Sequence, residues 1–149
     1  MSGIAIRTTV MVGFPGETEE EFSHLRSFVE QAEVDRLGIF VYSDEDGTPA
    51  ARLPGQVAPD VRVRRMMEIA ALQEEISRKK LRRRVGERYE VLVERREGDV
   101  LIGRTEYDAP EIDGVVRIET GKRIPRGSIV PVVITGSDAH NLTGVLAGD

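Results

Sequence analysis

The stretch Ile4–Phe22, IAIRTTVMVGFPGETEEEF, decides the fold of the first half of this chain. Its first eleven residues are mostly apolar and β-branched, which predicts an interior strand. A Pro-Gly turn follows, and Thr18 with Glu21 has the spacing of a capping box. Apolar residues then recur at helical spacing, so we expect an amphipathic helix from Glu19 to about Glu33.

A second apolar run, RLGIFVY at Arg36–Tyr42, predicts another strand. Strand, helix and strand in close succession are typical of a βαβ unit with parallel strands. A single βαβ unit cannot bury both faces of a parallel sheet. We therefore expect an α/β remnant of a larger domain, with an uncovered apolar strand edge on Ile4–Val12 or pairing with another copy there.

The periodicity changes along the rest of the chain. A long helix is predicted from Asp60 to about Arg84, with an apolar stripe of Met66, Ile69, Leu72 (with Ala70) and Ile76. After Gly86 the period becomes two, and five short strands are predicted: RYEVLVE, VLIGRTE, GVVRIE, SIVPVVITG and NLTGVLA. The fold class is therefore an α/β part at 1–84 followed by an all-β, OB-like small barrel at 85–149.

Charge and composition exclude several classes of site and of protein. The 149 residues carry a net charge of −5 and include no cysteine, which removes thiol chemistry and iron–sulfur ligation by this chain. The net charge is −6 over residues 1–58, +5 over 59–84 and −4 over 85–149, which favours a boundary near Val85. No apolar run has the length of a membrane span, so we expect a soluble, cytoplasmic protein.

Three polar stretches could carry chemistry. The turn VGFPGET at Val12–Thr18 follows a predicted parallel strand, where open α/β sheets bind small molecules, although a plain tight turn also explains it. The loop YSDEDGTPA at Tyr42–Ala50 could bind a cation or simply be solvated. The run RKKLRRR at Arg78–Arg84 could contact phosphates or offset a helix dipole.

The segment GRTEYDAPEIDGVVR, residues 103–117, holds four carboxylates between its two arginines. Turn chemistry accounts for Asp108 and Asp113. It does not account for Glu106 and Glu111. A loop of this charge would repel phosphate and would speed encounter with a basic protein.

Together these stretches resemble the C-terminal portion of the radical-SAM methylthiotransferases. IRTTVMVGFPGETEEEF and RLGIFVYSDEDGTPAARLP resemble the last two strands of that barrel, and LQEEISRKKLRRRVGERYEVLVE resembles the connector into the TRAM domain. GRTEYDAPEIDGVV resembles the RimO-type branch, which methylthiolates an aspartate of a small-subunit ribosomal protein.

The resemblance implies S-adenosylmethionine and two 4Fe-4S clusters in a full-length parent, with none of them bound by this chain alone. It implies that wall contacts to the adenosyl group come from Gly13, Phe14, Pro15, Phe40 and Tyr42. The acidic segment implies docking of a basic ribosomal protein through Arg104, Glu106, Asp108, Glu111 and Asp113. No residue is predicted to be catalytic or to bind metal, and the chain is expected to be inactive alone.

Two other interpretations remain open. The chain could be a tRNA-binding module of the MiaB-type branch, using Arg78–Arg84 and the basic residues near Lys122–Arg126. It could also be a non-catalytic adaptor or the product of a split gene.

Overall fold

The computed structural model describes residues 4–108 and 114–148. It forms two compact units: the first is Ala5–Ile76, and the second contains Ile4 together with residues 77–108 and 114–148. The division falls inside the long helix, whereas the sequence places the domain boundary after that helix, between residues 84 and 85. The boundary at 84 and 85 stays a prediction.

The first unit contains the predicted βαβ element. Strand β1 (Arg7–Val12) and strand β2 (Arg36–Val41) are parallel and in register, with Arg7 opposite Arg36 and Val12 opposite Val41. Helix α1 (Glu19–Ala32) connects them. The prediction of two parallel strands and an intervening helix is confirmed.

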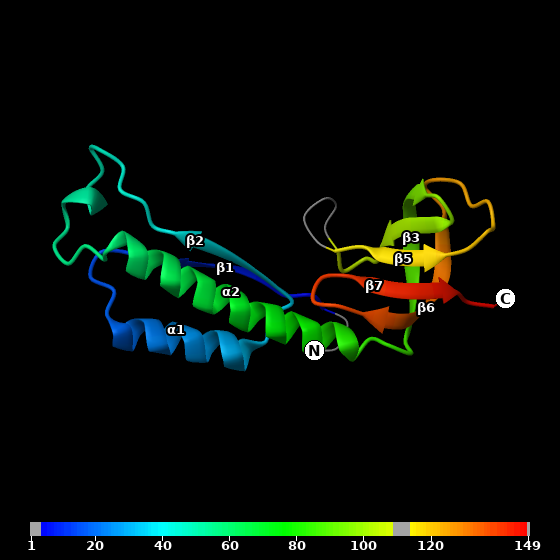
Figure 1. Ribbon diagram of the computed structural model, residues 1–149, viewed down its shortest axis with the longest axis horizontal. Helices are drawn as coiled ribbons and strands as arrows, with labels where there is room; N and C mark the ends of the chain where they lie inside the picture. The colour runs from blue at the N-terminus through cyan, green and yellow to red at the C-terminus, as the bar shows by residue number, and fades with distance from the viewer. Residues whose placement is uncertain (1–3, 109–113, 149) are drawn as a thin grey trace. The chain divides into compact units, whose positions relative to one another are not determined.

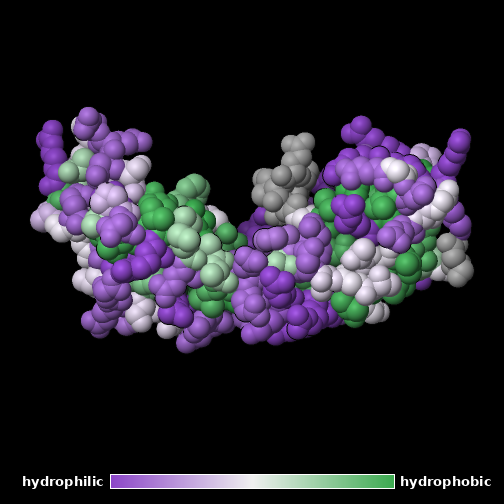
Figure 2. Space-filling model, in the orientation of Figure 1, coloured by the Kyte–Doolittle hydropathy of each residue, from purple (hydrophilic) through white to green (hydrophobic). Residues whose placement is uncertain are grey.

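Both helices of this unit cover the same face of the two-stranded sheet (Figure 1). A short 3-10 turn (Ala50–Arg52) precedes helix α2 (Pro59–Arg82), and the core between helices and sheet contains Val12, Phe22, Val29, Ile69 and Ile76. Among the described residues, β1 pairs with β2 and with no other strand, so its second edge is unpaired. On the sheet face opposite the helices, Met11 is 50% exposed and Phe40 is 60% exposed. The expected uncovered strand is therefore confirmed, and Figure 2 shows hydrophobic side chains over this sheet.

The predicted apolar stripe of α2 is largely confirmed. Ile69 and Ile76 are buried, and Met66 and Leu72 pack partly buried against the same core, whereas Ala70 is exposed. The buried face also holds polar side chains that were not predicted: Arg62, Arg65 and Gln73. Gln73 donates from its amide to the Val34 carbonyl at 3.0 Å. Apolar periodicity cannot reveal these positions, because their burial depends on partners supplied by distant loops.

Thr18 caps α1 as the sequence predicts, since its hydroxyl accepts from the Glu21 N–H at 3.1 Å. We expect Thr18→Ala to lower the free energy of unfolding by about 1 kcal/mol, because the amide loses its partner in the first helical turn. Urea unfolding of the chain measures this. Ser23→Ala, on an exposed position of the same helix, is the control, and an equal loss in both variants would contradict the capping role.

The second unit is a closed five-stranded barrel with neighbours in the order β3-β4-β5-β7-β6. β5 and β7 pair in parallel and the other pairs are antiparallel. All five predicted strands are present, and the OB-like class is confirmed: β3 (Arg88–Glu97), β4 (Val100–Arg104), β5 (Val116–Glu119), β6 (Ile129–Ser137) and β7 (Leu142–Leu146).

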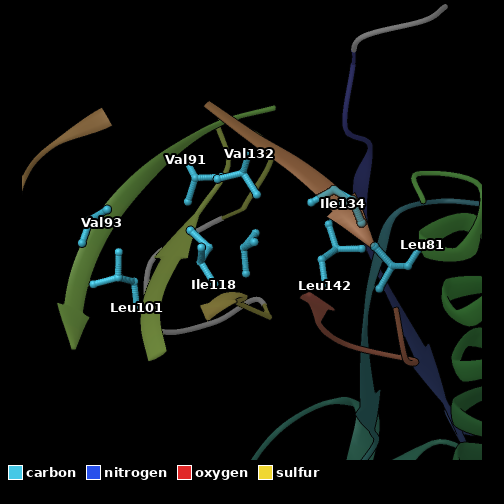
Figure 3. Close-up of a cluster of buried hydrophobic side chains, with 9 residues drawn as sticks. Leu81, Val91, Val93, Leu101, Ile118, Val132, Ile134 and Leu142 are labelled. Atoms are coloured by element: carbon cyan, nitrogen blue, oxygen red, sulfur yellow. The ribbon is translucent and has the colours of Figure 1, made fainter. Parts of the chain in front are cut away.

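The barrel interior is filled by alternate residues of its strands, as Figure 3 shows. Leu81, from the end of α2, joins this core with Ile134 and Leu142, so the last turn of the helix belongs to the barrel's packing. Two inward positions are glycines, Gly103 and Gly144, which lie against neighbouring strands. No helix among residues 4–108 and 114–148 is long and apolar enough to cross a membrane.

Candidate functional site

The carboxyl ends of β1 and β2 bring two of the predicted wall residues together. The Tyr42 N–H donates to the Val12 carbonyl at 2.9 Å, which carries the pairing of the two strands one residue past β2. The rings of Phe14 and Tyr42 then meet edge to face, with centroids 5.3 Å apart. Such a pair is a favoured aromatic geometry, so Tyr42 supports one side of Phe14.

The turn after β1 is closed by Glu17. Its carboxylate accepts from the Gly13 N–H at 3.0 Å and from the Arg65 guanidinium at 2.7 Å. Arg65 also donates to the Glu17 carbonyl at 3.2 Å and to the Glu19 carboxylate at 2.9 Å. Because Arg65 is 4% exposed, this ion pair is largely shielded from water and holds the turn against helix α2.

A third segment, residues 53–57, is tied to the same turn. The Gly16 N–H donates to the Gly55 carbonyl at 2.8 Å. The Gln56 amide donates to the carbonyls of Ala50 and Leu53, at 3.1 and 3.0 Å. The loops after the two strands and the loop before α2 therefore form one hydrogen-bonded assembly.

The five predicted wall residues divide by exposure. Phe14 is 44% exposed and Phe40 is 60% exposed, whereas Gly13, Pro15 and Tyr42 are buried. Phe14 and Phe40 are therefore the predicted wall residues with exposed aromatic side chains near the carboxyl ends of the two parallel strands. The three buried residues contribute no open wall of their own.

The barrel has a hollow of about 620 Å³ on its surface. Three of the five predicted partner-binding residues, Arg104, Glu106 and Asp108, line it, and the other two, Glu111 and Asp113, lie outside the described residues. The remaining lining residues are Arg88, Tyr89, Glu90, Leu92, Thr105, Tyr107 and Ile129. Three acids and two arginines therefore line the hollow, beside the apolar Leu92 and Ile129, of which Ile129 is 66% exposed.

The predicted residues in this hollow have different surroundings. The Asp108 carboxylate accepts from the Thr105 N–H at 3.1 Å and from the Thr105 hydroxyl at 2.9 Å. Arg104 forms an ion pair with Glu94. Glu106 is exposed, and its carboxylate accepts a hydrogen bond that raises the pKa of Tyr107. Of the two predicted acids that line the hollow, Glu106 is thus the exposed one, and Asp108 maintains the turn.

Two tyrosines and an arginine form a cluster beside the hollow. The rings of Tyr89 and Tyr107 are 6.2 Å apart, edge to face, and the Arg84 guanidinium lies 5.8 and 5.5 Å from their centroids. Burial and a hydrogen bond to Glu87 raise the pKa of Tyr89. Arg84, predicted as a possible phosphate contact, therefore packs on aromatic faces of its own barrel.

Comparisons with known proteins show what the sequence of this chain is similar to. Residues 85–146 match the family model of the TRAM domain. Proteins called ribosomal protein uS12 methylthiotransferase RimO are similar over nearly the whole chain. The protein of Desulforudis audaxviator (strain MP104C) is 48% identical over 140 residues, which is 94% of this chain and 31% of that protein. The protein of Prochlorococcus marinus (strain MIT 9303) is 46% identical over 146 residues, which is 95% of this chain and 31% of that protein.

The chain corresponds to the C-terminal, TRAM-bearing part of RimO-type proteins. A third relative, from Thermotoga maritima (strain ATCC 43589 / DSM 3109 / JCM 10099 / NBRC 100826 / MSB8), is 48% identical over 139 residues. The aligned region is 93% of this chain and 32% of that protein. The chain thus spans about a third of the length of the curated relatives it matches. The resemblance inferred from the motifs is confirmed.

The TRAM domain also carries a basic loop. Arg96 donates to the carbonyls of Thr120 and Lys122, at 2.8 and 2.9 Å, and so fixes the start of this loop. A second hollow, of about 520 Å³, lies here and is lined by Arg96, Gly121, Arg123, Ile124 and Pro125. The predicted basic segment Lys122–Arg126 therefore lies beside a hollow of its own.

Sequence reasoning missed Glu17, Arg62 and Arg65, which hold the strand-end loops. Their signal is weak in the sequence, since glutamates are frequent in first helical turns and the two arginines resemble solvated surface residues. The spacing of Arg62 and Arg65 with Ile69, at i, i+3 and i+7, was the available clue.

Proposed function

We propose that this chain is the C-terminal portion of a radical-SAM methylthiotransferase that modifies an aspartate of a small-subunit ribosomal protein. The similarity to RimO proteins over 93–96% of the chain is the observation that carries this proposal. The chain would supply two things to the full-length enzyme: an aromatic wall at the strand ends and a docking surface on the TRAM domain.

The cofactor and cluster, when bound, would supply the radical that removes hydrogen from the aspartate β-carbon. The residues of this chain would instead bind and position the cofactor. Phe14 and Phe40 expose rings beside which an adenine can lie, and Glu17 and Arg65 keep the turn that carries Phe14 in place. Because the chain has no cysteine, cluster thiolates must come from elsewhere, and we expect the chain to be inactive alone.

The docking surface is the acidic hollow. Glu90 and Glu106 would meet a basic partner, with Leu92 and Ile129 as apolar contacts. Asp108 adds negative charge although its carboxylate is turned toward Thr105, and the two lining arginines, Arg88 and Arg104, leave the hollow a small excess of acids. Each exposed ion pair contributes only about 0.2–1 kcal/mol, so most of the gain lies in association rate and partner choice. The acids would also discourage RNA from entering this hollow.

Charge reversal at the exposed acid tests the docking proposal. In the full-length enzyme, Glu106→Lys is expected to weaken binding of the purified ribosomal protein about fivefold at low salt, because an attractive contact becomes repulsive. Glu119→Lys is the matched control, since Glu119 is exposed on β5 and does not line the hollow. Titration at two salt concentrations measures both variants. Unchanged affinity of Glu106→Lys at low salt would refute docking at this surface.

The second hollow favours one alternative, contact of the TRAM domain with RNA. Arg96 and Arg123 line it, and Lys122 and Arg126 flank it in sequence. If RNA binds there, the chain should retain tRNA at about 150 mM salt, with affinity falling steeply as salt rises. Loss of this retention in Arg123→Glu, with normal binding of the ribosomal protein, would favour the RNA role for this end of the barrel.

A further inference from the structure

Arg62 is a buried arginine in the described part of the first unit, and all three of its guanidinium nitrogens donate hydrogen bonds. It is 7% exposed, although its helix begins only three residues earlier. Its Nε donates to the Val57 carbonyl at 2.7 Å, and one terminal nitrogen donates to the Tyr42 carbonyl at 3.2 Å. The other terminal nitrogen donates to the Gln56 amide oxygen at 3.3 Å and lies 3.5 Å from the Asp44 carboxylate.

The same side chain also lies over the ring of Tyr42, one member of the aromatic pair. Its guanidinium carbon lies 5.2 Å from the centre of the Tyr42 ring. Its aliphatic carbons pass close behind Gly13, where a Cβ would lie 2.5 Å from the Arg62 Cγ. Gly13 also has a φ of +80°, which side chains rarely adopt. The end of β1, the end of β2 and the loop before α2 are therefore all in contact with one arginine.

Burying a guanidinium costs more free energy than burying an apolar side chain of the same volume. An apolar residue could fill this space, but it could not bind two carbonyls and an amide oxygen in fixed directions. The planar fork of arginine does so, and a lysine can offer only a point charge. What arginine alone supplies here is therefore the fixed direction of its hydrogen bonds. One of these bonds holds the Tyr42 carbonyl in position.

We propose that Arg62 is a positioning residue for adenosyl binding. It holds Tyr42 against Phe14, so that the exposed Phe14 ring keeps its place before a ligand arrives. Arg62 does not touch the ligand itself; its effect passes through Tyr42 and Gly13. The inference rests on the proposed function, because it needs the strand ends to be the wall for S-adenosylmethionine.

The test uses the full-length enzyme and equilibrium dialysis with S-adenosylmethionine. Arg62→Lys and Arg62→Met are expected to raise the dissociation constant about tenfold, because small displacements of a binding group have effects of this size. The KM for S-adenosylmethionine should rise while kcat stays within about twofold. Arg64→Met is the control, since Arg64 lies two positions along on the exposed side, and it should leave binding unchanged.

Gly13→Ala provides a second route that keeps the arginine. Its new Cβ would push the Arg62 side chain away, but an alanine at a φ of +80° is also strained by itself. A rise in its dissociation constant therefore supports the inference only together with a rise in Arg62→Lys. Wild-type affinity in both Arg62→Lys and Gly13→Ala would overturn the inference while leaving the proposed function intact. Failure of the wild-type enzyme to bind S-adenosylmethionine would instead overturn the proposed function, and the inference with it.

Discussion

Gly103→Ala is expected to lower the free energy of unfolding of the barrel by about 3 kcal/mol, at the upper end of overpacking effects. A Cβ at this position would lie 2.5 Å from the Val91 Cγ1 and 2.6 Å from the Leu92 carbonyl oxygen. The carbonyl belongs to the paired strand β3, so it cannot move without disturbing the ladder. Urea unfolding of the chain, followed by circular dichroism, measures the loss.

Gly121→Ala is the matched control for this substitution. Gly121 has no heavy atom within 4 Å of the Cβ it would gain, and its φ lies outside the left-handed region. We expect its stability to stay within about 0.5 kcal/mol of the wild type. Equal losses in Gly103→Ala and Gly121→Ala would mean that β3 and β4 do not approach as closely as described.

Arg65→Met is expected to destabilise the first unit by about 3 kcal/mol. Arg65 is 4% exposed and its partner Glu17 is 12% exposed, so removal of the arginine leaves a shielded carboxylate without its cation. Breaking a buried ion pair from one side typically costs about 3–5 kcal/mol. We expect a loss at the low end of this range, because the Glu17 carboxylate still accepts a hydrogen bond from the Gly13 N–H. Thermal and urea unfolding report the change.

A substitution at the neighbouring Arg64 is the control that distinguishes loss of the buried ion pair from loss of a positive charge in general. Arg64 pairs with Glu19 at 3.3 Å, but both side chains are more than half exposed, so Arg64→Met should cost under about 1 kcal/mol. A double-mutant cycle with Arg65→Met and Glu17→Gln isolates the pair. A coupling energy near zero in that cycle would contradict the closed turn.

The elements of both units could be predicted from sequence because their signals are local. Alternating apolar residues in RYEVLVE indicated β3, and the Thr18 cap indicated the start of α1. The parallel pairing of β1 and β2 followed from their connection through a helix. These features depend on periodicity and on nearest neighbours, which a single sequence contains.

The buried polar contacts could not be predicted, because they join residues that are distant in sequence. Arg62 reaches Tyr42, twenty residues away, and Arg65 reaches Glu17, forty-eight residues away. The sequence also gives the number of acids in residues 103–117, but it does not show where their side chains point. Asp108 turns toward Thr105, whereas Glu106 is exposed, and only the geometry distinguishes them.

Site-specific photo-crosslinking tests the central claim most directly. A photoreactive amino acid replaces Ile129, which is 66% exposed on the floor of the acidic hollow, in the full-length enzyme bound to small ribosomal subunits. Our account predicts adducts to the proposed basic ribosomal protein, and fewer of them when Glu106→Lys is present. Adducts that are mainly to RNA, and insensitive to Glu106→Lys, would contradict it.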